Sequence, residues 1–145
     1  MTDAVKELLV KAPAAVIFPY LIDPDKFVQW MGTDVTIVAQ PGGEFRALCG
    51  GVNPSAGTFL EVVPESKVVF TFGWDLPDHP IPAGSTTVEI TLIPEGDATR
   101  VRLVHRGLPA DAIGDHLSGW NYYLDRLDKV VTGVDPGPDS PLGAP

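Results

Sequence analysis

The stretch HLSGWNYYLDRL, residues 116–127, decides the fold because it forms the centre of a long amphipathic helix. We expect this helix to cover residues 110–132, since its apolar residues recur at alternating spacings of four and three and so share one face. That stripe consists of Ile113, Leu117, Trp120, Leu124, Leu127 and Val131, and the opposite face carries Asp115, Asn121, Asp125 and Lys129. The helix should therefore lie with one face against an apolar surface and the other in water.

Most of the chain before this helix reads as short strands separated by turn residues. Strands are expected over residues 5–10, 35–38, 44–48, 57–63, 67–74, 86–93 and 99–106, and short helices over 13–20 and 23–30. The later strands alternate between apolar and polar residues, which predicts a sheet with one dry and one wet face. The fold class is therefore α+β: a curved antiparallel sheet of about seven strands wrapped around the long C-terminal helix, with two short helices after the first strand. A body of this shape is expected to enclose a hollow.

The length and composition fit one globular domain followed by a tail. The chain has 145 residues, of which 44% are hydrophobic and 20% are charged. We assign residues 1–132 to a single folded domain. Residues 133–145, which are rich in proline and glycine, are expected to form a disordered tail with few buried contacts.

The charge and the apolar runs exclude some classes of partner. A net charge of −9 argues against nucleic acid, because binding to phosphates relies on clustered Lys and Arg. No apolar run approaches the length of a membrane span, so no membrane partner is expected. Cys49 is the single cysteine, and the first residues lack the basic start and apolar core of a signal peptide. Both features predict a cytoplasmic protein.

Several short motifs follow one another in order along residues 4–132. They are Ala12-Pro13, Trp30-Met31-Gly32, Pro41-Gly42-Gly43-Glu44-Phe45, Glu61-Val62-Val63-Pro64, His105-Arg106-Gly107-Leu108-Pro109 and Gly119-Trp120. Together with the order of strands and helices, these motifs make the chain resemble the helix-grip fold of the START and birch-pollen-allergen superfamily (SRPBCC). Within that superfamily, the chain looks like the branch named after the activator of the heat-shock-protein-ninety ATPase.

The resemblance implies a cavity between the sheet and the long helix that takes a small, largely apolar ligand. It does not imply chaperone work. Relatives in the superfamily also include polyketide cyclases and dehydratases, so an enzyme of that type is the first alternative to a binding protein. The second alternative is an interaction module that modulates a chaperone or forms a homodimer through the sheet.

The expected cavity wall combines aromatic side chains with a few polar ones. Its residues are Trp30, Arg46, Phe70, Phe72, Trp74, His105, Trp120 and Tyr123. Apolar walls supply affinity by burying ligand surface, at about 25 cal/mol per Å², and polar groups fix the orientation of the ligand. The polar candidates are His105, Arg46, Tyr123 and Asp75. The plain alternative for the aromatic residues is core packing between the helix and the sheet.

His105 is the best candidate for an acid or base, because it ends an otherwise apolar, inward-facing row of its strand. Its plain alternative is a core histidine whose hydrogen bonds are made within the protein. Glu44 or Asp75 would serve as the acid or base if its side chain turned inward. His116 lies beside the apolar stripe of the helix and is expected in water.

No catalytic, metal or cofactor site follows from the sequence. The three histidines and the single cysteine lack the close spacings that bring metal ligands together. No phosphate-cradling glycine loop or dinucleotide fingerprint is present. Cys49 is expected to be an inert, partly buried thiol. The sequence therefore favours binding of a small hydrophobic molecule, without a metal or cofactor, over catalysis.

Overall fold

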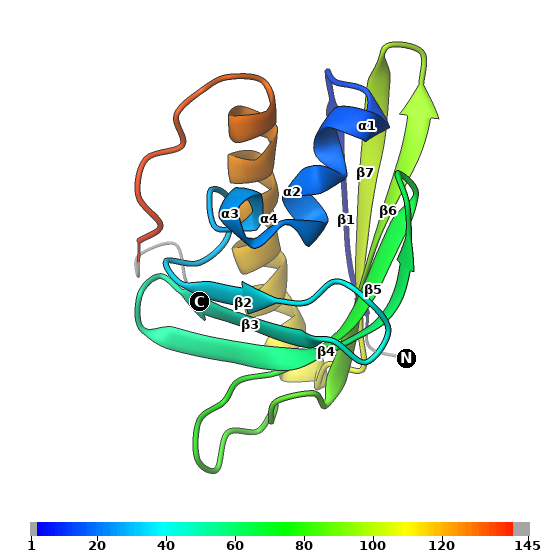
Figure 1. Ribbon diagram of the computed structural model, residues 1–145. Helices are drawn as coiled ribbons and strands as arrows, with labels where there is room; N and C mark the ends of the chain where they lie inside the picture. The colour runs from blue at the N-terminus through cyan, green and yellow to red at the C-terminus, as the bar shows by residue number, and fades with distance from the viewer. Residues whose placement is uncertain (1–2, 141–145) are drawn as a thin grey trace.

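The computed structural model describes residues 3–140 and places one long helix across the concave face of a curved sheet (Figure 1). The sheet has seven strands in the order β1-β7-β6-β5-β4-β3-β2, each antiparallel to its neighbours. The strands are β1 (Asp3–Val10), β2 (Val35–Ile37), β3 (Glu44–Cys49), β4 (Asn53–Val63), β5 (Lys67–Phe72), β6 (Thr86–Glu95) and β7 (Ala98–Arg106). The expected α+β helix-grip fold is confirmed.

Short helices close one end of the sheet, as three single turns instead of the two helices expected. They are α1 (Ala14–Ile17), α2 (Pro19–Ile22) and α3 (Pro24–Phe27). Pro19 and Pro24 each begin a new turn, because a proline is accepted at the first helical position but interrupts a helix that would continue through it. The Asp23 side chain caps α3 by accepting a hydrogen bond from the Asp25 N–H (3.0 Å).

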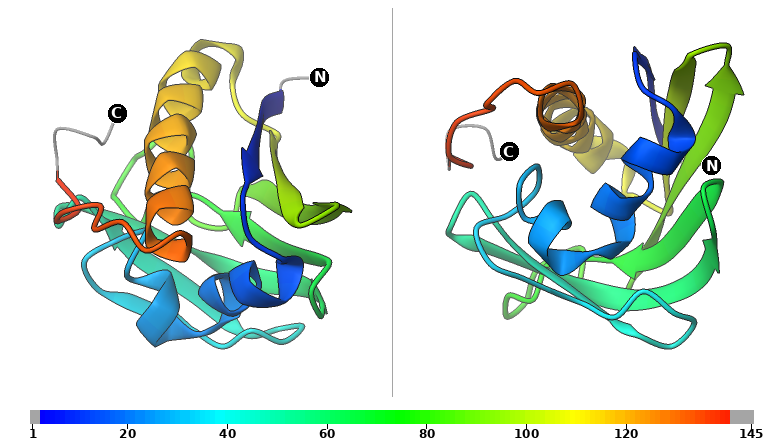
Figure 2. Two further views of the ribbon diagram at one scale, coloured as in Figure 1. Left: turned by 90° about the horizontal axis from the view of Figure 1, so that it is seen from above. Right: turned by 45° about the horizontal axis from the view of Figure 1, so that its top comes forward.

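The long C-terminal helix, α4 (Ile113–Val131), follows a short 3₁₀ turn, η1 (Ala110–Ala112). Figure 2 shows the sheet and the short helices curving around it. The residues that α4 buries are His116, Gly119, Trp120, Tyr123, Leu124, Arg126 and Leu127. The apolar stripe expected from the sequence included Ile113, Leu117 and Val131, which are only half-buried. The buried face of α4 therefore differs from the expected stripe. The rings of His116 and Tyr123 pack against apolar neighbours with their ring carbons, and their polar atoms make hydrogen bonds.

The sheet bends at β4. Residues 53–58 of this strand pair with β3, whereas residues 59–63 pair with β5, with a register shift between Phe59 and Glu61. At the bend, a Cβ on Gly57 would lie 1.8 Å from the carbonyl oxygen of Thr71, so only glycine fits there. β4 also begins four residues earlier than Gly57, its expected start, because pairing with β3 overrides the low strand propensity of Asn53 and Pro54.

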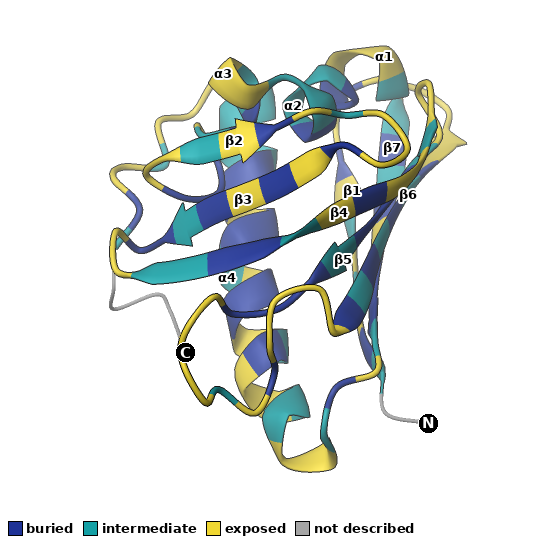
Figure 3. Cartoon of the chain, turned by 60° about the horizontal axis from the view of Figure 1, so that its bottom comes forward, coloured by how far each residue is buried: buried dark blue, intermediate teal, exposed yellow. Residues whose placement is uncertain are grey.

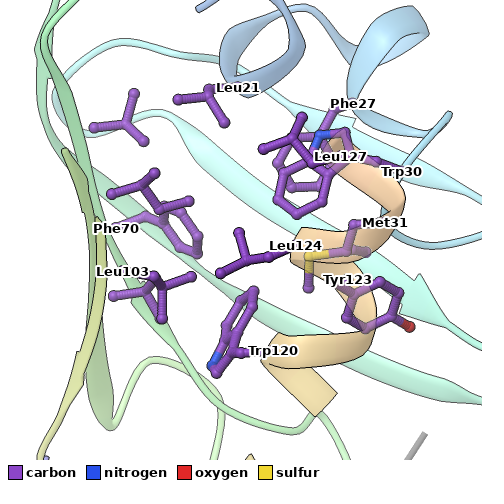
Figure 4. Packing of buried hydrophobic residues seen from close by; sticks show 14 of the residues in the cluster. Leu21, Phe27, Trp30, Met31, Phe70, Leu103, Trp120, Tyr123, Leu124 and Leu127 are labelled. Carbon is purple, nitrogen blue, oxygen red and sulfur yellow. The ribbon is translucent and has the colours of Figure 1, made fainter. Parts of the chain in front are cut away.

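Apolar side chains fill the space between the sheet and α4. In Figure 4, Leu124 of α4 points toward Phe70 of β5, and Leu127 of α4 and Leu103 of β7 belong to the same buried cluster. Phe45 of β3 stacks on Phe70, with ring centroids 4.3 Å apart. Buried and exposed positions alternate along the strands (Figure 3), which gives the sheet the dry and wet faces expected.

The chain turns back after α4 and contacts the folded body, which differs from the disordered tail expected over residues 133–145. Gly133 (φ 86°) ends α4 in a Schellman motif, in which the Val134 N–H bonds to the Lys129 carbonyl (2.7 Å). Farther along, the Asp139 side chain is 9% exposed and is held by donors that include the Gly50 N–H at the β3–β4 turn. The prediction of a disordered tail used amino-acid composition, which reflects local conformational preference. Composition does not show hydrogen-bond partners from distant parts of the chain. Residues 141–145 of the expected tail lie outside the described residues.

None of the helices in residues 3–140 combines the length and the apolar character that crossing a membrane requires.

Candidate functional site

A small cavity lies between the sheet and the middle of α4. Its volume is about 20 Å³, which is room for about one water molecule. The wall is largely aromatic and consists of Met31, Cys49, Phe72, Trp74, His116, Gly119, Trp120 and Tyr123. The hollow expected from the fold is therefore almost filled by the protein's own side chains.

His105 of β7 lies behind Trp120 and Phe72 and belongs to a closed chain of hydrogen bonds. Its Nδ1 accepts a hydrogen bond from Trp120 Nε1 (3.0 Å), and its Nε2 lies 2.7 Å from Thr86 Oγ1. The Thr86 hydroxyl donates to the Phe72 carbonyl (2.6 Å). His105 therefore carries its proton on Nε2 and donates it to Thr86, because that arrangement satisfies every group in the chain.

Burial keeps His105 neutral. Loss of hydration, followed by the effect of the nearby His116, lowers the pKa of His105 from 6.5 to about 3. The Nδ1 lone pair, which a general base would use, is already engaged by Trp120. The geometry therefore matches the plain alternative, a histidine whose hydrogen bonds are made within the core.

Trp74 and His116 repeat this arrangement nearer the surface. Trp74 Nε1 donates to His116 Nε2 (3.3 Å), and His116 Nδ1 donates to the Ala112 carbonyl (2.8 Å). Burial lowers the pKa of His116, against the raising effects of its hydrogen bond to Ala112 and of the charge on Asp115. His116 is 8% exposed, so the expectation that it lies in water is wrong. The ring packs edge-on against His105, with centroids 5.4 Å apart.

An open cleft of about 280 Å³ lies against the same Trp74–His116 pair. Its walls are formed by residues 74–81, before β6, and by residues 111–116, where α4 begins. Because Trp74 and His116 line both the cleft and the cavity, these two side chains separate the interior from the surface.

Cys49 and Tyr123 form another part of the cavity wall, and both stay protonated. Burial raises the pKa of the Cys49 thiol to about 11, which fits the inert thiol expected. Burial, followed by the effects of Cys49 and Asp139, also raises the pKa of Tyr123. The Tyr123 hydroxyl therefore donates its proton to the Asp139 carboxylate (3.0 Å) while its ring faces the cavity.

The residues expected to line the cavity occupy different depths. Those that do line it are Phe72, Trp74, Trp120 and Tyr123. His105 contacts the ring of Phe72 from behind the wall (5.1 Å between centroids). Phe70 and Trp30 belong to the surrounding core, where Phe70 stacks on Phe45 and the Trp30 indole donates to the Tyr20 carbonyl (2.8 Å).

Arg46 lies on the outer surface, and the expectation that it faces the cavity is wrong. Its guanidinium bonds to Glu44 (2.8 Å) and Asp75 (3.0 Å), and about half of each of these three side chains is exposed. Glu44 and Asp75 therefore also point away from the interior, so neither serves as a cavity acid or base. The strand pattern predicted which backbone positions lie near the site. It did not predict where a long side chain, or a side chain at the end of a strand, points.

The structure also places residues in or beside the cavity that the sequence reasoning left out. Met31, Cys49 and His116 line it. Asp139, from the segment expected to be disordered, bonds to the Tyr123 hydroxyl at its edge. The motif Trp30-Met31-Gly32 gave a signal for Met31, but no local pattern marked Asp139.

Solved structures share this architecture. The chain is 38% identical to an AHSA1-like protein from Rhizobium etli, with a TM-score of 0.71, over 94% of this chain and 86% of that one. DynU16, a protein of the dynemicin biosynthetic locus, has a TM-score of 0.81 at 20% identity; the match covers 97% of this chain but only 51% of DynU16, so this chain spans about half its length. The Aha1 dimer from Colwellia psychrerythraea has a TM-score of 0.76 at 18% identity, with 90% of this chain and 96% of that one covered. Both likenesses near 20% identity show the fold.

A family model identifies the relationship at the level of sequence. No curated protein matches the chain. The model of the Activator of Hsp90 ATPase homolog 1-like proteins, in contrast, matches residues 11–132, a range that contains the short helices, strands β2–β7 and α4. The chain belongs to the family of Activator of Hsp90 ATPase homolog 1-like proteins.

Proposed function

We propose that the protein binds a small, largely hydrophobic molecule between the sheet and α4. The observation that carries this proposal is the aromatic cavity whose polar atoms are paired with one another. The indole N–H groups of Trp74 and Trp120 both bond to histidines, and within residues 3–140 no side-chain nitrogen or oxygen of the wall is buried without a partner. Such a wall offers apolar surface to a ligand and leaves few polar groups to orient it.

The ligand would enter by displacing the Trp74–His116 pair. The cavity alone is too small for any organic ligand, but it shares these two side chains with the cleft of about 280 Å³. A rotation of the Trp74 ring would break one hydrogen bond of 3.3 Å and join the two spaces, whereas a rotation of His116 would also break its hydrogen bond of 2.8 Å to the Ala112 carbonyl. The joined volume would reach the lower end of ordinary small-molecule sites, about 300 Å³. The free energy gained by burying apolar ligand surface would offset the cost of breaking the hydrogen bond.

The contacts favour binding over acid–base catalysis. Both ring nitrogens of His105 are engaged, and Glu44 and Asp75 form ion pairs on the outer surface. The outer sheet face carries ion pairs such as Arg106–Glu89 (3.0 Å), which does not favour a chaperone-modulating surface. We assign the protein to the cytoplasm, where a single buried thiol stays reduced.

The test combines a ligand screen with two matched glycine variants of α4. Thermal shift would screen fatty acids, sterols, flavonoids and polyketide-like aromatics, the last because DynU16 comes from the dynemicin locus. Gly119→Ala adds a methyl group to the cavity wall, whereas Gly114 is exposed on the same helix with nothing within 4 Å of an added Cβ. Calorimetry should show affinity for the best ligand reduced about tenfold or more in Gly119→Ala only, since overpacking costs about 1–3 kcal/mol. A screen without hits, or equal affinities in the two variants, would contradict the proposal.

A further inference from the structure

The buried carboxylate of Asp139 occupies a site built by other parts of the chain. Its Oδ2 accepts hydrogen bonds from the N–H groups of Gly32 (3.1 Å) and Gly50 (2.8 Å) and from the Tyr123 hydroxyl (3.0 Å). Its Oδ1 accepts one from the Tyr122 hydroxyl (3.0 Å). The loop after α3, the β3–β4 turn and α4 thus supply four neutral donors to one carboxylate. We name these four residues, Gly32, Gly50, Tyr122 and Tyr123, the carboxylate site.

The two glycine donors, Gly32 and Gly50, are held in position without Asp139. The Thr33 N–H bonds to the Leu48 carbonyl (2.9 Å), and the Leu48 N–H bonds to the Asp34 carbonyl (2.9 Å). These two hydrogen bonds fasten the loop that carries Gly32 to the strand end that carries Gly50. The segment after α4 therefore contributes the acceptor to a site whose two backbone donors the rest of the fold arranges.

The carboxylate site adjoins the cavity. Gly32 follows Met31 and Gly50 follows Cys49, and both Met31 and Cys49 line the cavity. Tyr123 belongs to both places, since its ring lines the cavity and its hydroxyl binds Asp139. Figure 4 shows this ring with its oxygen pointing away from the apolar cluster. A ligand whose apolar part filled the cavity would thus find donors for a carboxylate at its edge.

We propose that the carboxylate site recognises the ligand's own carboxylate, and that Asp139 fills the site when no ligand is bound. This inference rests on the proposed function and names the ligand class: hydrophobic carboxylic acids. The donors suit a carboxylate, because hydrogen bonds to an ionised acceptor are about twice as strong as neutral ones. The buried guanidinium of Arg126 bonds to the carbonyls of residues 136–138 and so holds the segment in place instead of pairing with Asp139.

Asp139 would act as a competitor tethered to the protein. A tethered group competes at an effective concentration on the order of millimolar for a short, flexible connection. The apparent affinity of a ligand falls by the fraction of molecules whose site is free. Removing the Asp139 carboxylate should therefore strengthen binding of an acid and leave binding of the matching neutral compound unchanged.

The experiment compares 2-naphthoate with 2-naphthamide by calorimetry on three full-length proteins. Asp139→Ala should bind 2-naphthoate about tenfold more tightly than the wild type, because its site is always free. The same variant should bind 2-naphthamide as the wild type does. Asp135→Ala is the matched control: it removes an exposed carboxylate of the same segment, one that bonds only locally to the Gly137 N–H, and should behave as the wild type.

A second measurement uses the unaltered protein and stands even if Asp139→Ala folds poorly. Saturation with 2-naphthoate should accelerate hydrogen exchange of the backbone amides of Asp139 and Ser140, the second of which bonds to the Tyr122 hydroxyl, and 2-naphthamide should not. Equal gains for acid and amide in Asp139→Ala, or unchanged exchange in the wild type with bound naphthoate, would overturn the carboxylate site and leave the proposed function standing. Absence of binding by either compound, together with a screen without hits, would instead refute the proposed function.

Discussion

At the scale of single residues, the site depends on two tryptophan–histidine pairs. Each indole donates to a neutral imidazole, Trp120 to His105 and Trp74 to His116. Each histidine donates a hydrogen bond from its own N–H to an oxygen, of Thr86 in one pair and of Ala112 in the other. The pairs bury polar atoms beside a cavity without leaving them unsatisfied, which would otherwise cost about 1–3 kcal/mol for each group.

The neutral state of His105 predicts how stability depends on pH. Its folded pKa, about 3, lies below its ordinary value of 6.5, so between these values the unfolded chain binds the additional proton. Stability from this group is complete above pH 6.5 and is lost as the pH falls toward about 3, by up to about 1.4 kcal/mol per pH unit.

His105→Gln isolates this contribution, because Gln offers an acceptor to Trp120 and a donor to Thr86 but does not titrate. Urea unfolding of both proteins between pH 4 and 7 should show a shallower loss of stability in the variant, by about 1 kcal/mol or more over the range. Parallel curves would mean that His105 is hydrated or charged in the folded protein.

At the scale of elements, β4 decides the curvature of the sheet. Its first half belongs with β3 and its second half with β5, and the change occurs beside Gly57. The backbone of Thr71 approaches so closely that a side chain at residue 57 would collide with its carbonyl oxygen. The bend directs β2 and β3 under α4, and so places Cys49 and Gly50 beside the cavity and the carboxylate site.

Gly57→Ala should therefore destabilise the protein, by about 3 kcal/mol or more, because the collision is with rigid backbone and not with a movable side chain. Chemical denaturation measures the change. The same substitution at Gly114, where an added Cβ meets nothing within 4 Å, should leave stability equal or higher, since Ala favours a helix. A mild effect at residue 57 would show that β4 can shift to relieve the contact.

At the scale of the whole molecule, the segment after α4 joins α4 to the loop after α3 and to the β3–β4 turn. Asp139 joins the loop after α3, the β3–β4 turn and α4, while Arg126 bonds both to this segment and to the Trp30 carbonyl (3.0 Å). The segment thus runs back beside α4 and contacts the β3–β4 turn. Within residues 133–140, the buried contacts of Asp139 thus exceed the few expected from a composition rich in proline and glycine.

Ending the chain at Val134 should lower the melting temperature by about 5 °C or more, because it removes the hydrogen bonds of Asp139 and three acceptors of the buried Arg126. The truncation keeps the Schellman motif, so α4 retains its cap. The full chain, measured in parallel, is the reference. If the shorter chain lost less than about 2 °C, the original expectation of a loosely held tail would stand.

The sequence by itself determined the fold through local periodicities. The helical spacing over residues 113–131, the alternation in β5 to β7 and the turn-forming glycines each report a backbone state, and together they leave few other ways to bury the apolar side chains. Phe72 and Trp120 border the small cavity because an inward position on a strand or helix follows from its period.

Only the tertiary structure decided what the interior holds. The nearly filled cavity depends on how rings from different elements fit, and the inward turn of His116 depends on Trp74, which lies 42 residues earlier in the chain. Asp139 meets the N–H of Gly32 across 107 residues. Periodicity carries no information about such partners, because hydrogen bonds between distant segments are selected by three-dimensional proximity and burial, not by spacing along the chain.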